Sequence, residues 1–399
     1  LYAITDTQPT PLRELPRPAR FPRYGQATVV LQVRGMRGIV ARLRAYDPGH
    51  DLPSLRLRHG PALAELGSNE NPYGPSPRVL QALRTLAAEE VYRYPDPQGL
   101  GLRRALAAQL GVEPAEICLG NGSHELLMLL AQCFAAPGDE VVHSEFGFAV
   151  FAIATAAVGA TPRIVPALPA GHPQRRGHDL AAIAAAVGPR TRLVYLANPN
   201  NPTGTWFDRA ELEACLRAIP ADVPVVVDEA YHEYVTEPAI GSALALRARH
   251  PNLVVTRTFS KGHGLAGLRV GYAIADAAVV AILNRLRESF NVGGPSLLAA
   301  SVALDDPGHV ATTRDGTRAM REQLARELQM LPLQVTPSQT NFLLLDFGRD
   351  AAPVERGLYA RGVVVRPMGG YGLPDCLRVN LGREDDNARF LAALREVLA

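Results

Sequence analysis

The chain has 399 residues, of which 47% are hydrophobic, so it can bury a large core and is expected to form two linked domains. Its formal net charge of +2 is small for this length and does not indicate a nucleic-acid partner. The four cysteines are far apart without metal-ligand spacing, which predicts no metal and reduced thiols in a cytoplasmic protein. The longest weakly polar run, "FGFAVFAIATAAVGATP", falls short of the roughly 20 residues of a membrane-spanning helix, so we expect no membrane segment.

Residues 1–38 contain the proline- and arginine-rich run "PTPLRELPRPARFPRYGQ", which has no hydrophobic periodicity. We interpret them as a disordered arm outside the fold. Residues 39–92 are expected to form an N-terminal segment that contributes to a smaller domain.

From residue 93 to 293 apolar strands alternate with alanine- and leucine-rich helices. Strands that are apolar throughout and separated by helices indicate a mainly parallel sheet covered on both faces, here a large cofactor-binding domain. The segment 269–275 follows the preceding strand too closely for a crossover helix and is expected to pair antiparallel. We expect helices at 100–111 and 124–135, and strands at 139–146, 163–168, 192–199, 223–231 and 252–260.

Beyond residue 293 the pattern changes to long amphipathic helices with a few strands and a closing helix. This pattern predicts a second, smaller α+β domain over residues 294–399. Its strands are expected at 341–347, 362–367 and 376–382.

Lys261 is the only lysine of the chain, whereas arginine supplies all other positive side-chain charge. It stands at the end of the buried strand 252–260, where an ammonium group is costly to desolvate. A lysine in a flexible surface loop is the simplest reading of such a residue. However, one lysine kept in an arginine-rich chain suggests a nitrogen that must lose its proton, which arginine cannot do.

Polar side chains follow three neighbouring strands at the point where each strand ends. "LANPNNPTG" carries Asn201, "VVVDEAYHEY" carries Asp228 and Tyr231, and "TFSK" carries Ser260 beside the lysine. In open α/β sheets ligands bind outside the carboxyl ends of the strands. We therefore expect these side chains to form one site.

The segment "LGNGSHELL" presents free backbone N–H groups at a helix start, which suits a phosphate group. A glycine turn with a serine cap is the competing interpretation. The dinucleotide fingerprint fails, because Glu125 stands where its third glycine is required. Arg269 could supply a bidentate partner for the same phosphate.

A lysine, a strand-end carboxylate, a tyrosine, an asparagine and a phosphate site together indicate pyridoxal 5'-phosphate. In this interpretation Lys261 forms an imine with the cofactor and Asp228 keeps the pyridine nitrogen protonated. Tyr231 and Asn201 hydrogen-bond the ring oxygen, and Phe146 lies on the ring face.

The motifs "SNENPYGPSP", "YRYPDPQG", "GNGSHELL", "NPNNPTG", "TFSKGHGLAGLRVGY" and "LRVNLGREDDN" resemble, in the same order, those of histidinol-phosphate aminotransferases. The resemblance runs from about residue 39 to the end and implies the fold of fold-type I pyridoxal-phosphate transferases. It implies a catalytic set of Lys261, Asp228 and Tyr231. The cofactor-binding set that it implies adds Gly122, Ser123, His124, Phe146, Asn201, Thr258, Ser260 and Arg269, with Tyr94 from the other subunit of a homodimer. The substrate-binding set is Tyr73, Asn341, Arg366 and Arg378.

The implied reaction converts L-histidinol phosphate and 2-oxoglutarate to imidazole-acetol phosphate and L-glutamate in histidine biosynthesis. The sequence departs from the family pattern at His124, where aspartate is usual, and at Glu288, Ser289 and Gly293 near the substrate. Three other readings remain open. The chain could be an aromatic-amino-acid aminotransferase of the same fold, a pyridoxal-phosphate decarboxylase of a phosphorylated amino acid, or a non-catalytic binding protein.

Overall fold

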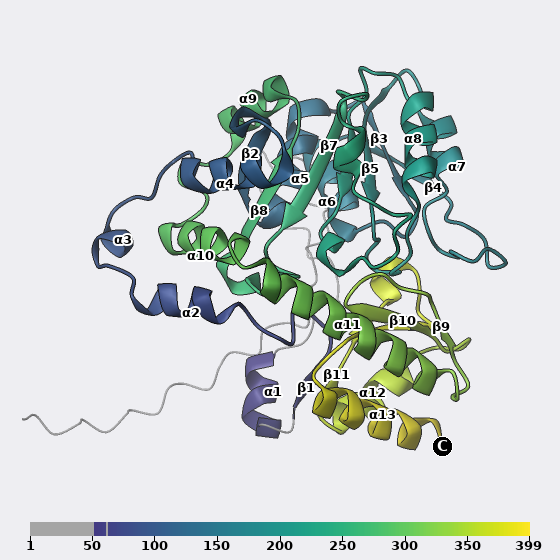
Figure 1. Ribbon diagram of the computed structural model, residues 1–399. Coiled ribbons are helices and arrows are strands. Elements are labelled where there is room, and N and C mark those ends of the chain that lie inside the picture. Colours follow the sequence, from purple (N-terminus) through teal and green to yellow (C-terminus); the bar gives the residue numbers. More distant parts are fainter. Residues whose placement is uncertain (1–51, 61–62) are drawn as a thin grey trace, which may run out of the picture. The chain divides into compact units, whose positions relative to one another are not determined.

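The computed structural model describes residues 52–60 and 63–399 (Figure 1). The predicted arm, residues 1–38, and the first part of the predicted N-terminal segment lie outside the described residues, so both remain predictions. The described chain begins with α1 (Leu52–His59).

The large domain is built on a seven-stranded sheet in the order β2-β8-β7-β6-β5-β3-β4. The strand β8 runs antiparallel to both of its neighbours, and the pairs from β7 to β4 are parallel, as the sequence predicts. The strand bounds are β2 (Ile117–Asn121), β3 (Glu140–Ser144), β4 (Thr161–Val165), β5 (Thr191–Ala197), β6 (Val225–Asp228), β7 (Leu253–Thr258) and β8 (Val270–Ile274).

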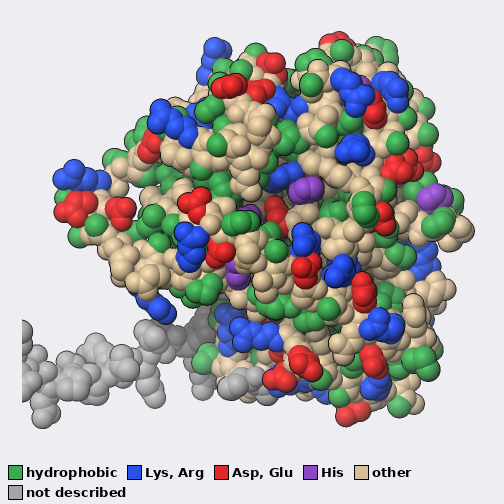
Figure 2. Space-filling model, viewed as in Figure 1, with side chains coloured by type: hydrophobic (Ala, Val, Ile, Leu, Met, Phe, Trp, Pro, Cys, Tyr) green, Lys and Arg blue, Asp and Glu red, His purple; other side chains and the backbone are tan. Residues whose placement is uncertain are grey.

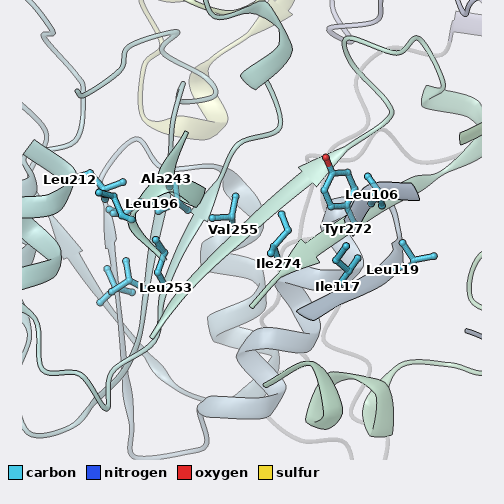
Figure 3. Packing of buried hydrophobic residues seen from close by; sticks show 14 of the residues in the cluster. Leu106, Ile117, Leu119, Leu196, Leu212, Ala243, Leu253, Val255, Tyr272 and Ile274 are labelled. Atoms are coloured by element: carbon cyan, nitrogen blue, oxygen red, sulfur yellow. The ribbon is translucent and has the colours of Figure 1, made fainter. Parts of the chain in front are cut away.

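Helices cover both faces of this sheet, which explains why its central strands are apolar throughout (Figure 1). Along β5, Val194 and Leu196 enter the core cluster on one face, whereas Leu193 and Tyr195 enter the cluster on the other. Figure 3 shows side chains of the first cluster spread along the sheet, with Val255 and Ile274 from strands between Leu212 and Leu106 from helices. The first face is covered by α2 (Pro77–Arg84), α4 (Leu100–Leu110), α7 (Leu180–Ala186), α8 (Arg209–Ala218) and α10 (Gly294–Leu304), and the second by α5 (Gly122–Phe134), α6 (Ala149–Val158) and α9 (Ala277–Leu286).

The small domain contains a four-stranded antiparallel sheet in the order β12-β13-β10-β9. Leu324, Leu343, Leu377 and Phe390 belong to its separate hydrophobic core. The predicted strand 362–367 is divided, since β11 pairs with β1 and β12 pairs with β13. The elements are β1 (Ala64–Glu65), α11 (Pro307–Leu328), β9 (Gln334–Val335), β10 (Phe342–Asp346), α12 (Ala352–Ala360), β11 (Val363–Val364), β12 (Arg366–Pro367), β13 (Cys376–Asn380) and α13 (Glu384–Leu398).

The domain limits at residues 92 and 294 remain predictions. The hydrophobic cores that the neighbouring elements join indicate where these limits lie. Residues 64–65 pair with a small-domain strand, in keeping with the assignment of the N-terminal segment. Val79 of α2 and Ala299 of α10, in contrast, pack in the core of the large sheet. The long helix α11 then leads into the small domain (Figure 1). The contacts therefore favour limits after β1 and within the α10–α11 connection.

Acidic and basic side chains are interspersed over the face shown in Figure 2, in keeping with the small net charge. Within the described part of the chain, no helix is both long and apolar enough to cross a membrane.

A buried ion pair joins the ends of β6 and β7 next to the polar residues predicted there. Glu229, directly after β6, accepts hydrogen bonds from Nε and Nη2 of Arg257 at 2.9 and 2.8 Å. Their side chains are only 2% and 9% exposed. The carboxylate also accepts from Ser242 Oγ and from the backbone N–H of Ala243, so both charges are well compensated.

We predict that Glu229→Gln lowers the free energy of unfolding by about 3–5 kcal/mol, because it leaves the Arg257 cation buried without its counter-charge. Urea denaturation measures the loss. The matched control is Glu213→Gln, which breaks a surface pair with Arg249, whose side chain is 61% exposed, and should cost no more than about 1 kcal/mol. Equal losses in the free energy of unfolding for the two substitutions would contradict this prediction.

Candidate active site

A cavity of about 400 Å³ opens at the carboxyl ends of β5, β6 and β7, where the sequence places its polar residues. It contains ten of the predicted site residues, from both domains of the described chain. These are Ser123, His124, Asn201, Asp228, Tyr231, Thr258, Ser260, Lys261, Arg269 and Arg378. The rest of its wall is formed by Ser68, Asn69, Phe148, Ala197, Pro199 and Ala230.

The side chain of Lys261 reaches into this cavity and ends beside the N-terminal segment. Its Nζ donates to the carbonyl oxygen of Asn69 at 3.0 Å and lies 3.4 Å from that of Ser68. It also stands 5.8 Å from the centre of the Tyr231 ring. Desolvation by the surrounding protein lowers the pKa of Lys261 to about 7, and the positive charge of Arg378 adds to this effect. Near neutral pH a large fraction of this amine is therefore neutral and nucleophilic.

Asp228 ends β6 and is the only carboxylate in the cavity wall among the described residues. Its side chain accepts a 2.9 Å hydrogen bond from Thr256 Oγ1, and the residue is 4% exposed. Burial raises the pKa of Asp228 to about 7 despite that bond. A cationic group bound next to it would reverse this shift, because an opposite charge favours the ionised carboxylate.

Arg378 of β13 connects the small domain with the large domain and with the N-terminal segment. Its Nη1 donates to Asn201 Oδ1 at 2.6 Å, and its Nη2 donates to the carbonyl oxygen of Gly67 at 2.9 Å. The guanidinium group also lies 5.2 Å from the centre of the Phe342 ring, in a cation–π arrangement. These contacts hold a fixed cation at the cavity wall.

The residues predicted to bind phosphate lie where α5 begins, beside Arg269. The backbone N–H of Gly122 donates to the carbonyl oxygen of Arg269 at 3.1 Å, and Arg269 Nη1 lies 3.4 Å from Ser260 Oγ. Gly122 has a φ of +73°, and a Cβ on it would lie 2.5 Å from Arg269 Nη2. Glycine is therefore required here both by the backbone conformation and by the close approach of the guanidinium group.

The side chain of Tyr231 accepts a 2.8 Å hydrogen bond from Asn69 Nδ2. Asn69, together with Ser68, forms part of the cavity wall, although the sequence reasoning assigned neither residue a role. Both stand in the quoted motif "SNENPYGPSP", and Asn69 adopts a φ of +55°, which asparagine tolerates better than most residues. The motif was therefore the feature of the sequence that could have indicated a role for Ser68 and Asn69 in the site.

Six predicted residues lie outside the cavity wall, and two of them are aromatic residues assigned to the cofactor. Phe146 packs against the small-domain cluster that contains Met368, whereas Phe148 borders the cavity. Tyr94 is 83% exposed and stacks on Phe290 with ring centroids 4.6 Å apart. Their assigned roles remain predictions.

The other four lie at the start of α5, in or next to the small-domain sheet, and beside a second cavity. Gly122 shapes the start of α5, as described above. Asn341 donates to the carbonyl oxygens of Asn69 and Glu70, both at 3.1 Å, and Arg366 is the strand partner of Arg378. Tyr73 borders a different cavity, next to α11 and α13. The assignment of these residues to substrate or cofactor also remains a prediction.

The cavity suits a phosphorylated pyridine aldehyde on three grounds. It offers a lysine whose lowered pKa makes it nucleophilic, a buried carboxylate that gains from a cationic partner, and a helix start with an arginine that suits a phosphate. Pyridoxal 5'-phosphate has the complementary aldehyde, ring nitrogen and phosphate.

Residues 62–394 match the family model of aminotransferase class I and II, and the chain belongs to this family. The sequence is 47% identical over 363 residues to histidinol-phosphate aminotransferase 2 of Pseudomonas aeruginosa, covering 90% of this chain and 96% of that protein. It is 45% identical over 369 residues to histidinol-phosphate aminotransferase 2 of Methylococcus capsulatus, covering 92% and 98%.

Among solved structures, the fold matches histidinol-phosphate aminotransferase from Sinorhizobium meliloti in complex with pyridoxal 5'-phosphate. The TM-score is 0.82 and the identity 32%, covering 92% of this chain and 98% of that one. These findings confirm the predicted family, the fold-type I architecture, the aminotransferase class and the cofactor.

Because the chain has one lysine, the pKa of Lys261 can be measured directly. Reductive methylation of the cofactor-free protein with ¹³C-formaldehyde labels this side chain besides the amino terminus. We predict an NMR titration midpoint near pH 7 in the folded protein. In urea the midpoint should return to about 10.4, the value of an unperturbed lysine. A midpoint of about 10 in the folded protein would contradict the desolvated environment.

A second prediction concerns Asp228 in the cofactor-free protein. The pKa of its folded form, about 7, lies above the unfolded value of about 3.9, so stability present at low pH is lost as pH rises through about 7. Asp228→Asn should therefore become more stable relative to wild type between about pH 4 and pH 7, and the difference should level off above that range. Urea unfolding at several pH values tests this.

Saturation with pyridoxal 5'-phosphate should then stabilise the wild type more than the Asp228→Asn variant. Turnover of the variant should fall by about 100-fold or more, in the range for removal of a preorganised electrostatic partner. A variant with unchanged pH dependence and normal turnover would argue against the role of Asp228.

Proposed function

We propose that the protein transfers the amino group of L-histidinol phosphate to 2-oxoglutarate, forming imidazole-acetol phosphate and L-glutamate in histidine biosynthesis. The observation that carries the proposal is the fixed guanidinium of Arg378 on the wall of the lysine-containing cavity. Relatives named histidinol-phosphate aminotransferase, matched over at least 90% of this chain, support the choice of substrate.

The substrates require one site to accept two kinds of anion. Histidinol phosphate carries a phosphate but no carboxylate, whereas 2-oxoglutarate carries two carboxylates. A guanidinium fork pairs with either group through two parallel hydrogen bonds, while a compact ammonium charge does not. Arg378, fixed by Asn201 and Gly67, is suited to orient both substrates. Arg366, its neighbour across the strand pair, is assigned the phosphate of the donor.

Bound pyridoxal 5'-phosphate would supply an electron sink and hold the amino group between the two halves of the reaction. The chain's own residues provide the rest. The Lys261 amine, with a pKa of about 7, can accept and return a proton near neutral pH. Asp228 places a carboxylate where a protonated ring nitrogen would be stabilised, and Tyr231 and Asn201 would hydrogen-bond the ring oxygen. Gly122, Ser123, His124, Thr258, Ser260 and Arg269 would hold the phosphate.

We also propose that the protein forms a homodimer in which Tyr94 reaches the cofactor phosphate of the other subunit. The exposure of Tyr94 at 83%, next to Val91 at 71% and Tyr92 at 66%, supports this, because such an apolar group favours burial against a partner. Sedimentation velocity tests whether the protein is a dimer in solution.

A cytoplasmic location is proposed as well. It is supported by the four cysteines, which form no disulfide, and cell fractionation tests it.

An aromatic-amino-acid aminotransferase remains the second candidate, favoured by the replacements at Glu288, Ser289 and Gly293. The two functions differ in the amino donor. We predict that the change in cofactor absorbance with L-histidinol phosphate is faster, at equal donor concentration, than with L-phenylalanine or L-tyrosine. Faster reaction with an aromatic donor would replace the proposal by the second candidate.

Arg366→Ala should lower kcat/KM for histidinol phosphate at least tenfold more than for phenylalanine, because only the former has a phosphate to lose. Arg361→Ala is the matched control, since its side chain forms an exposed pair with Glu396 and should leave both donors unaffected. Equal losses with the two donors would place Arg366 outside phosphate recognition.

A further inference from the structure

One end of the cavity combines a titratable imidazole with a fixed positive charge. His124 stands in the first turn of α5, a helix of 13 residues, and borders the cavity together with Ser123 and Arg269. Thr258 and Ser260 complete this end with hydroxyl groups. Among the described residues, the only carboxylate of the cavity wall is Asp228, at the end of β6. The end near α5 is therefore built for a negative group.

The neighbouring carboxylate of Glu125 is directed elsewhere. It accepts hydrogen bonds from the backbone N–H of Asn121 at 2.6 Å and from Asn291 Nδ2 at 2.7 Å. It is thus engaged by the strand end before α5 and by the loop before α10. It does not occupy the side of the helix start that borders the cavity. His124 is left as the titratable side chain that this turn contributes to the wall.

Arg269 is close enough to influence the imidazole. Its guanidinium group packs against Gly122, two residues before His124, and approaches Ser260. Burial, and then the positive charge of Arg269, lower the pKa of His124 below its usual value of about 6.5. In the cofactor-free protein the imidazole is accordingly neutral at neutral pH. A dianion bound between the two groups would oppose this shift, because its negative charge favours the imidazolium form and offsets the repulsion from Arg269.

We propose that His124 is a protonation-dependent ligand for the phosphate group of the cofactor, so that phosphate binding is coupled to the uptake of a proton. The inference rests on the proposed function only in placing the cofactor phosphate at the start of α5. In its imidazolium form the side chain supplies a second cation and a charge-assisted donor beside Arg269. In its neutral form it supplies neither the charge nor the stronger bond.

The sign of the pH dependence follows from the two states. The pKa of His124 is lowered in the empty site and is raised when a dianion is bound, so binding takes up a proton at pH values between the two. Within that window the affinity for the phosphate rises as pH falls. The same cavity wall carries Lys261 and Asp228, whose pKa values burial shifts to about 7, the phenol group of Tyr231, and the guanidinium groups of Arg269 and Arg378. A variant of His124 is therefore needed to isolate its share.

The probe is pyridoxine 5'-phosphate, which has the phosphate and the ring but no aldehyde to react with Lys261. Its dissociation constant is measured by calorimetry on the cofactor-free protein between about pH 5.5 and pH 8, the range over which histidine changes its charge. Buffers with different ionisation enthalpies report the number of protons taken up. The proteins compared are wild type, His124→Asn and His172→Asn, the last replacing an exposed histidine in a loop away from the cavity.

As pH rises from about 5.5 to 8, we expect the affinity of the wild type and of the His172→Asn variant for the probe to fall. Their loss should be about tenfold larger than that of the His124→Asn variant, which corresponds to the loss of one charged hydrogen bond. Their proton uptake should exceed that of the His124→Asn variant by up to one proton. Protonation of the free probe is the same for all three proteins and cancels in the comparison. Identical pH profiles in wild type and His124→Asn would overturn the proposal.

Two further measurements separate the possible failures. If Arg269→Ala leaves the affinity for the probe unchanged, the phosphate does not bind at this end, and it is the assignment in the proposed function that fails. If the His124→Asn variant does not fold, the ring-proton NMR signal of His124 in the wild type gives the answer. Its titration midpoint must rise when the probe binds, and an unchanged midpoint would refute the coupling.

Discussion

The desolvation of one lysine is the constraint on which the site depends. Lys261 lies at the end of β7 because the parallel strands around it deliver their carboxyl ends to one edge of the sheet. Its Nζ is held by backbone carbonyl groups of Asn69 and Ser68, which belong to a segment distant in sequence. The N-terminal segment thus forms one wall of the cavity next to the amine, whose pKa is lowered by burial and by the positive charge of Arg378.

Arg378 links the same wall to the small domain. It contacts Asn201 from the large domain and Gly67 from the N-terminal segment, so three parts of the chain meet at one guanidinium group. A displacement of the small domain would move this cation relative to Lys261, whose pKa it lowers. The basicity of the lysine is thereby tied to one arrangement of the domains, and an anion bound at Arg378 would weaken the effect of this cation on the amine.

The sheet and its polar edge could be predicted from the sequence because they depend on local pattern. Apolar strands between helices indicate a covered parallel sheet, and Asp228 and Lys261 follow directly from where two of those strands end. What could not be predicted depends on packing between distant segments. Phe148 rather than Phe146 borders the cavity, because Phe146 is drawn into the small-domain cluster with Met368. Asn69 enters the wall through a left-handed backbone conformation that no periodicity reveals.

The pKa values of two ionisable groups in the cavity wall, Lys261 and Asp228, are shifted in opposite directions by the same cause. Burial brings the pKa of Lys261 down to about 7 and that of Asp228 up to about 7, so each group is partly neutral in the cofactor-free protein near neutral pH. A ligand that bonds to a neutral amine and brings a cation to the carboxylate relieves both penalties at once, whereas a ligand with only one of these features relieves one. In the Glu229–Arg257 pair, by contrast, each buried charge already has an opposite charge as its partner, so a ligand would relieve no desolvation penalty there. A pyridine aldehyde therefore suits both groups, since its aldehyde is complementary to the neutral amine and its ring nitrogen to the buried carboxylate.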